Sequence, residues 1–229
     1  MEPVVGAGSS VSRPLRVLVI CGSPRRRGNS AALVDVVRSA LAGVATSDPS
    51  LSTDVEVVWP AELAIEGCTA CGGCDATGQC TTPDAMVGIY DSIDGADALL
   101  WISPVYFSSI PSQLKAFVDR FQVYWARRTL RRLAGTTLPR TARRPAGAVL
   151  LRGGGDPFGA DGAVTPLRAA SNLAEFALVD PLVIEGPDTT APVTGERFAN
   201  ERELVADLAV ELVVRARVWV DAHDAEGTR

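Results

Sequence analysis

Short apolar runs and longer amphipathic stretches alternate along this 229-residue chain. The apolar runs are rich in β-branched residues, which is typical of strands buried in a parallel sheet. They are Leu15–Cys21, Val55–Trp59, Ala98–Ile102, Ala146–Leu151 and Leu178–Ile184. The amphipathic stretches predict helices over Ser30–Val44, Pro83–Ile93, Pro111–Leu133, Val164–Phe176 and Glu201–Trp219.

This alternation predicts an α/β fold in which helices cover both faces of a parallel sheet. Because crossovers between parallel strands are right-handed, five strands favour a doubly wound, three-layer, flavodoxin-like sheet of order 2-1-3-4-5. We expect a flexible N-terminal tail over 1–14 and a single domain over 15–222, with a cysteine-rich loop at 67–81. In such sheets ligands bind at the carboxyl ends of the strands.

Charge and hydropathy exclude several classes of protein. The net charge of −5 argues against nucleic-acid binding. The longest uncharged stretch, Ala98–Leu114, contains two prolines and is too short to span a bilayer. No basic cluster precedes an apolar run near residue 1, so we expect no secretory signal. These features predict a cytoplasmic protein with no membrane partner.

The loop after the first strand, residues 22–30 (GSPRRRGNS), has the composition of an anion site. A helix start presents free N–H groups and a partial positive charge, and phosphate binds well there. Ser23, Asn29 and Ser30 offer side-chain donors, the arginines offset the charge of a dianion, and Gly28 allows close approach of the backbone. Alternatively, Ser30 or Asn29 only caps the helix. The loop matches neither the nucleoside-triphosphate nor the Rossmann glycine motif.

The loop after the third strand, residues 104–108 (PVYFS), carries an aromatic pair. Tyr106 and Phe107 follow a buried strand at the same predicted edge, where they could sandwich a planar ligand. Alternatively, the two rings close the core beneath the loop.

Cys68, Cys71, Cys74 and Cys80 lie within 13 residues. In a reducing compartment such a group indicates metal or redox chemistry more than disulfides. The C-x2-C-x2-C opening is also that of ferredoxin-like [4Fe–4S] sequences. A structural zinc site, which more often uses two separated C-x2-C pairs, remains an alternative. Free thiols or a disulfide are a further one.

Two remaining features limit the chemistry. The basic stretch between the third helix and the fourth strand could bind nicotinamide phosphates or an acidic redox partner, or be a solvated helix end or a subunit contact. It contains Arg127, Arg128, Arg131, Arg132, Arg140, Arg143 and Arg144. His223 is the only histidine, which disfavours Ser-His-Asp and Cys-His mechanisms, so we predict no catalytic side chain.

Four segments together resemble the NADPH-dependent FMN reductase group of flavodoxin-like proteins, and within it the iron–sulfur flavoproteins. They are GSPRRRGNS at 22–30, CTACGGC at 68–74 with Cys80, PVYFSSIPSQLKAFVDR at 104–120 and the glycines at 153–155. The segment at 83–86 (PDAM) departs from many relatives, which carry paired acids before the methionine.

The resemblance implies an FMN cofactor and a homodimer or homotetramer. Ser23, Arg25, Asn29 and Ser30 would hold the phosphate, next to Gly28. The isoalloxazine ring would be bordered by Pro104, Val105, Tyr106 and Phe107, with Gly153 and Gly154 near its other side. Cys68, Cys71, Cys74 and Cys80 would ligate a [4Fe–4S] cluster.

From these features we predict an FMN-dependent oxidoreductase that passes electrons between FMN and the cluster. The donor would be NAD(P)H or a redox protein, and the acceptor a quinone, a flavin or a small organic molecule. One alternative is a cluster-free NAD(P)H-dependent FMN or quinone reductase. Another is a non-catalytic flavodoxin-like module with a zinc-stabilised loop.

Overall fold

The computed structural model describes residues 13–136, 143–154 and 157–225. Most of the predicted tail, Arg140 and Gly155 lie outside these ranges. The described strands form one sheet in which every neighbouring pair is parallel. They are β1 (Leu15–Cys21), β2 (Thr53–Val58), β3 (Ala98–Pro104), β4 (Arg144–Arg152), β5 (Phe176–Leu178) and β6 (Leu182–Glu185). The order β2-β1-β3-β4-β5 confirms the predicted topology, and β6 also pairs with β4.

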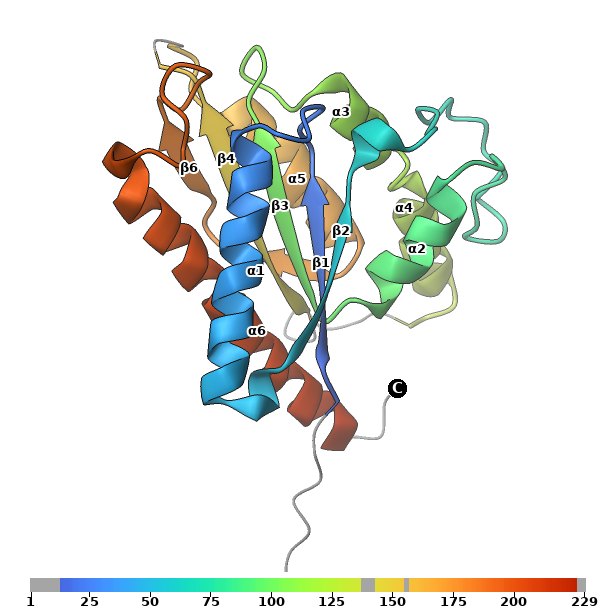
Figure 1. Ribbon diagram of the computed structural model, residues 1–229. Coiled ribbons are helices and arrows are strands. Elements are labelled where there is room, and N and C mark those ends of the chain that lie inside the picture. Colours follow the sequence, from blue (N-terminus) through green and yellow to red (C-terminus); the bar gives the residue numbers. More distant parts are fainter. Residues whose placement is uncertain (1–12, 137–142, 155–156, 226–229) are drawn as a thin grey trace, which may run out of the picture.

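Helices cover both faces of the sheet and make three layers (Figure 1). One face is covered by α1 (Asn29–Ser47) and α6 (Ala199–Ala225). The other face is covered by α2 (Met86–Gly95), α3 (Ser112–Asp119), α4 (Gln122–Leu133) and α5 (Asp161–Leu173). Short 3-10 turns lie at Pro49–Leu51, Pro60–Glu62 and Glu196–Phe198.

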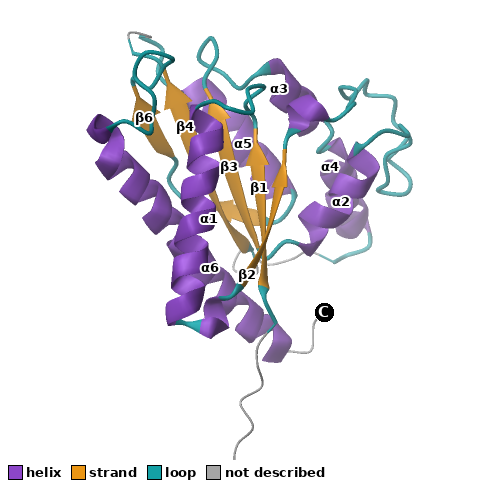
Figure 2. Cartoon of the chain, viewed as in Figure 1, coloured by secondary structure: helices purple, strands orange, loops and turns teal. Residues whose placement is uncertain are grey.

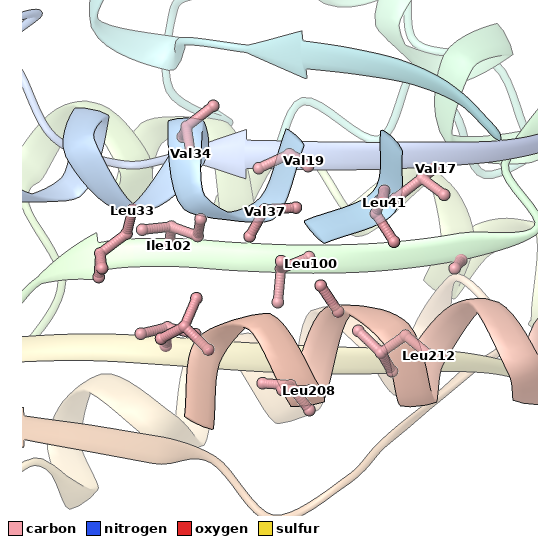
Figure 3. Close-up of a cluster of buried hydrophobic side chains, with 14 of the residues drawn as sticks. Val17, Val19, Leu33, Val34, Val37, Leu41, Leu100, Ile102, Leu208 and Leu212 are labelled. Carbon is pink, nitrogen blue, oxygen red and sulfur yellow. The ribbon is translucent and has the colours of Figure 1, made fainter. Parts of the chain in front are cut away.

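The core on the α1 and α6 side shows why these residues form these elements. In β1, Val17 and Val19 are buried, and Val19 lies opposite Val57 of β2 and Leu100 of β3. Side chains of α1 and α6 converge on this surface in Figure 3. They include Leu33, Val37, Leu41, Leu208 and Leu212, all of which are buried. Helical spacing and strand alternation therefore meet in one apolar layer.

The α1 helix is also long and apolar enough, by length and mean hydropathy alone, to be a membrane-span candidate. Its Leu33, Val37 and Leu41 side chains pack against the sheet, as those of a core helix do.

The predicted fifth strand, Leu178–Ile184, is wrong as one element. The structure has two short strands, β5 and β6, that pair with opposite ends of β4, and they are separated by Val179, Asp180 and Pro181. Proline has no N–H to donate to a strand ladder and therefore interrupts the pairing.

The predicted helix over Pro111–Leu133 is likewise two helices, α3 and α4, separated at Arg120 and Phe121. The carbonyl oxygen of Arg120 accepts a hydrogen bond from Tyr90 Oη at 3.0 Å, and the side chain of Arg120 is buried. These tertiary contacts hold the backbone at the break, which local sequence preference does not specify.

Candidate functional site

The loops after β1, β3 and β4 meet at the carboxyl edge of the sheet (Figure 2). They line an open cavity of about 620 Å³. This volume lies in the range of small-molecule sites. Nine of the eleven residues predicted to bind a cofactor line it: Ser23, Arg25, Gly28, Asn29, Ser30, Pro104, Val105, Tyr106 and Gly153. Residues from three loops distant in sequence are thus brought to one place.

The start of α1 faces this cavity. Gly28 is its N-cap and supplies no side-chain hydrogen bond, and the first backbone bond runs from Ala32 N–H to the Gly28 carbonyl at 3.1 Å. The N–H groups that come before Ala32 in the first turn have no acceptor within the helix. Ser30 and Ser23 are buried beside them, and Ser23 Oγ accepts a hydrogen bond from the Arg25 N–H at 3.1 Å.

The three consecutive arginines point to different places. Arg25 and Arg27 are exposed and line the cavity. Arg26 instead pairs with Glu62, and its guanidinium lies 4.4 Å from the centre of the Trp59 ring. Two of the three guanidinium groups therefore belong to residues that line the cavity.

Asn29 contacts a segment that the sequence did not single out. Its Oδ1 accepts a hydrogen bond from Val193 N–H at 3.0 Å, and its Nδ2 donates to the Asp188 carbonyl at 3.3 Å. The segment 187–192 contributes Pro187, Asp188, Thr189 and Pro192 to the cavity wall. A Gly-Pro-Asp turn directly after β6 was the available signal, because that strand also ends at the carboxyl edge.

The aromatic loop forms a tight turn at the rim. Tyr106 and Ser109 exchange backbone hydrogen bonds of 2.8 and 3.0 Å, and Phe107 and Ser108 between them have φ of 48° and 59°. Tyr106 is 40% exposed and Phe107 fully exposed, so this pair does not close the core.

Phe107 and Gly154 are not among the residues that line the cavity. Gly153 does line it, and a Cβ added at Gly153 would meet no other part of the chain within 4 Å.

All four clustered cysteines line a second cavity, of about 410 Å³, in the loop between β2 and α2. Cys68 and Cys71 are exposed, whereas Cys74 and Cys80 are half-buried. Trp125 of α4, which is 58% exposed, and Arg120 form part of its wall. The predicted ligands therefore share one space.

Local contacts shift the pKa values of these thiols in different directions. Burial raises the pKa of Cys74. The pKa of Cys71 is lowered, mainly by a hydrogen bond with the Gly73 N–H and less by one with the Thr81 side chain. At Cys80, burial opposes ionisation, but the Thr82 N–H and the Arg120 guanidinium outweigh it and lower the pKa.

The loop is held by two arginines. Arg120 Nη2 donates to Cys80 Sγ at 3.2 Å, and Arg127 Nε donates to the Gly78 carbonyl at 2.8 Å. Among the described residues, no three His, Cys, Asp or Glu side chains are grouped closely enough to hold one metal ion.

The basic stretch bonds mainly to the chain itself. Arg127 and Arg131 pair with Asp94 and Glu175, and Arg128 donates to Asn172 Oδ1 at 3.0 Å. These contacts favour the structural interpretation of these arginines over a phosphate site.

The family model for NADPH-dependent FMN reductases matches residues 15–180, which contain both cavities except for the segment at 187–192. The chain belongs to the NADPH-dependent FMN reductase family. The predicted family and fold are thereby confirmed.

Iron–sulfur flavoproteins are among the relatives of this FMN reductase-like chain. It is 33% identical to one from Archaeoglobus fulgidus over 117 residues, which cover 51% of the chain and 50% of that protein. It is 33% identical to one from Methanosarcina thermophila over 106 residues, which cover 46% of the chain and 52% of that protein. The chain thus spans about half the length of these relatives.

Solved structures show the same fold. An NAD(P)H:quinone oxidoreductase from Methanothermobacter marburgensis superposes with a TM-score of 0.55 at 15% identity, over 88% of this chain and 98% of that chain. An NADH:FMN oxidoreductase superposes with a TM-score of 0.53 at 16% identity, over 86% of this chain and 89% of that chain.

Proposed function

We propose that this chain is an FMN-dependent oxidoreductase that passes electrons between FMN and a [4Fe–4S] cluster held by its cysteine loop. The observation that carries the FMN part is the cavity at the start of α1, where nine predicted residues, Arg25 among them, meet a second exposed arginine, Arg27. Membership in the FMN reductase family supports it.

The residues present suit a flavin phosphate at one end of the cavity and a planar ring at the other. The first turn of α1, with Ser30 and the cations of Arg25 and Arg27, offers donors and positive charge to a dianion. One wall of the cavity is partly apolar and consists of Pro104, Val105 and Tyr106. Gly153 also lines the cavity, and the space next to its Cα is open. Apolar walls with a few placed polar groups are typical of cofactor sites.

Bound FMN would link two-electron exchange with a nicotinamide to one-electron exchange with iron. The chain's own part is to bind and orient. Asn29 joins α1 to the segment at 187–193, which closes one side of the cavity. We assign no side chain the role of catalytic acid or base.

The four cysteines suit a polynuclear centre. Thiolates are the preferred ligands of iron–sulfur clusters, and all four border one cavity. The overlapping C-x2-C-x2-C spacing argues against the zinc module, because zinc sites more often use two separated C-x2-C pairs. The iron–sulfur flavoprotein relatives support the cluster.

Among the described residues no three His, Cys, Asp or Glu side chains are grouped as they would be around a metal ion, which favours one second candidate, a cluster-free NAD(P)H-dependent FMN or quinone reductase. In both cases the domain would span 15–222 and act in the cytoplasm as a homodimer or homotetramer. The donor would be NAD(P)H or a redox protein, and the acceptor a quinone, a flavin or a small organic molecule.

Titration of the flavin-free chain with FMN and with riboflavin tests the phosphate site. Riboflavin lacks the phosphate, so we expect FMN to bind more tightly, and Arg25→Gln to weaken FMN about tenfold or more while leaving riboflavin unchanged. Arg26→Gln is the matched control, because Arg26 pairs with Glu62 away from the cavity. Equal affinity for both flavins would overturn the proposed phosphate site.

A further inference from the structure

We propose that Arg120 is a positioning residue that fixes Cys80 and both ends of the cysteine loop in the arrangement that receives the metal centre. This inference deepens the proposed function and rests on it for the identity of that centre. Arg120 is the last residue of the 104–120 segment and does not line the flavin cavity, so the proposed function gives it no role there.

The side chain of Arg120 is 2% exposed and bonds three separate places in the loop. Its Nη1 donates to the Glu66 carbonyl at 2.9 Å and to the Asp84 carboxylate, and its Nη2 donates to Cys80 Sγ at 3.2 Å. Because a buried guanidinium needs acceptors for its donors, these bonds hold one another in place.

Asp84 extends this network to the two ends of the loop. Its carboxylate also accepts the Glu66 N–H and the Met86 N–H, each at 3.0 Å. Glu66 lies just before the first clustered cysteine, and Met86 begins α2. The Arg120–Asp84 pair therefore ties the start of the loop to its end.

Arg120 is itself anchored. It lies at the break between α3 and α4, and its carbonyl accepts the Tyr90 hydroxyl at 3.0 Å. Tyr90 belongs to α2, so the helix that follows the loop also holds the residue that organises it. The wrongly predicted continuous helix thus breaks at the residue that the loop needs.

Arginine suits this position and lysine does not. A planar guanidinium can donate to a carbonyl, a carboxylate and a sulfur at once, whereas an ammonium group acts as a compact point charge. The cation next to Cys80 also stabilises negative charge on that sulfur. Groups that hold and hydrogen-bond metal ligands set both affinity and reduction potential.

The test compares Arg120→Gln and Arg120→Lys with Arg128→Lys in the full chain, purified without oxygen. Arg128 bonds Asn172 of α5 and is the matched control. For Arg120→Gln we expect loss of iron to a chelator to become about tenfold faster or more. We also expect a reduction potential shifted downward, because the lost cation favoured the more negative state. In Arg120→Lys the reduction potential should shift downward less than in Arg120→Gln, because a positive charge remains, but iron should still be lost quickly.

Amide hydrogen exchange over residues 66–84 of the metal-free full chain separates this inference from the proposed function. We expect at least tenfold faster exchange in both Arg120 variants than in the wild-type chain or Arg128→Lys. If Arg120→Gln does not fold, Arg120→Lys decides.

Wild-type exchange in both Arg120 variants would overturn the positioning role, whether or not iron is present. Faster exchange together with an iron-free wild-type chain would leave the positioning role standing and overturn the cluster. Iron in the wild-type chain, with unchanged retention and potential in Arg120→Gln, would overturn the positioning role and leave the cluster standing.

Discussion

At the scale of single residues, buried arginines connect separate elements of this molecule through hydrogen bonds. Arg144, 9% exposed at the start of β4, donates to the carbonyl groups of Ile93, Asp94, Ala96 and Ala174 over 2.7–3.1 Å. Its guanidinium also lies 3.9 Å from the centre of the Phe176 ring. One side chain thus joins the end of α2 to the end of α5, and burial lowers its pKa.

Replacement of Arg144 by methionine should destabilise the chain by about 3 kcal/mol or more, because several buried carbonyl groups would lose their donor. Urea unfolding of the full chain measures the difference. Arg215→Met is the control, since Arg215 forms an exposed pair with Glu211, and there we expect less than about 0.5 kcal/mol. Similar values for the two variants would contradict the anchoring role of Arg144.

Contacts between single residues also show which features of the site the sequence could predict and which it could not. The anion loop was predictable because its donors lie within nine consecutive residues. The bond between Asn29 and Val193 joins residues 164 positions apart, and the Arg120–Asp84 pair joins residues 36 apart. No local pattern specifies such partners, so the proposed role of Arg120 was missed. The wall at 187–192 was missed although the Gly-Pro-Asp turn after β6 gave a local signal of it.

At the scale of elements, the turn at Tyr106–Ser109 carries backbone strain at the rim of the cavity. Phe107 has φ of 48°, and its side chain is fully exposed, so no burial within the chain compensates for a left-handed conformation. Strain of this kind gathers at ligand sites. Its placement beside the cavity agrees with a role for this turn in binding.

Phe107→Asn should raise the free energy of unfolding of the flavin-free chain by about 1 kcal/mol, because asparagine tolerates the left-handed region. Phe107→Ala removes the ring without relieving the backbone and should change little. Chemical denaturation of both variants gives the comparison. Destabilisation by both substitutions would show that the ring, and not the backbone, determines the stability of the turn.

Helices and strands were predictable where periodicity was local. Leu15–Cys21 was predicted as a strand and is one, and every residue of it except Arg16 is buried, as its apolar composition predicts. The prediction overlooked Pro181, although proline is a signal of a broken strand. The break at Arg120 had no such signal, because bonds to α2 and to the cysteine loop hold it.

At the scale of the whole molecule, strand order was predictable because right-handed crossovers leave few topologies for alternating strands and helices. That order places the loops after β1, β3 and β4 at one edge, where they form the first cavity. The loop after β2 carries the cysteines and forms the second cavity. One domain would therefore hold both of the proposed redox groups.

The most direct test is an anaerobic absorption spectrum of the freshly purified full chain, with assays of flavin, iron, zinc and acid-labile sulfide. We predict one FMN per chain, flavin bands over a broad shoulder in the blue, and about four iron and four sulfide per chain. Flavin without iron would remove the cluster and leave the simple reductase. A colourless chain that binds zinc and no FMN would contradict the account.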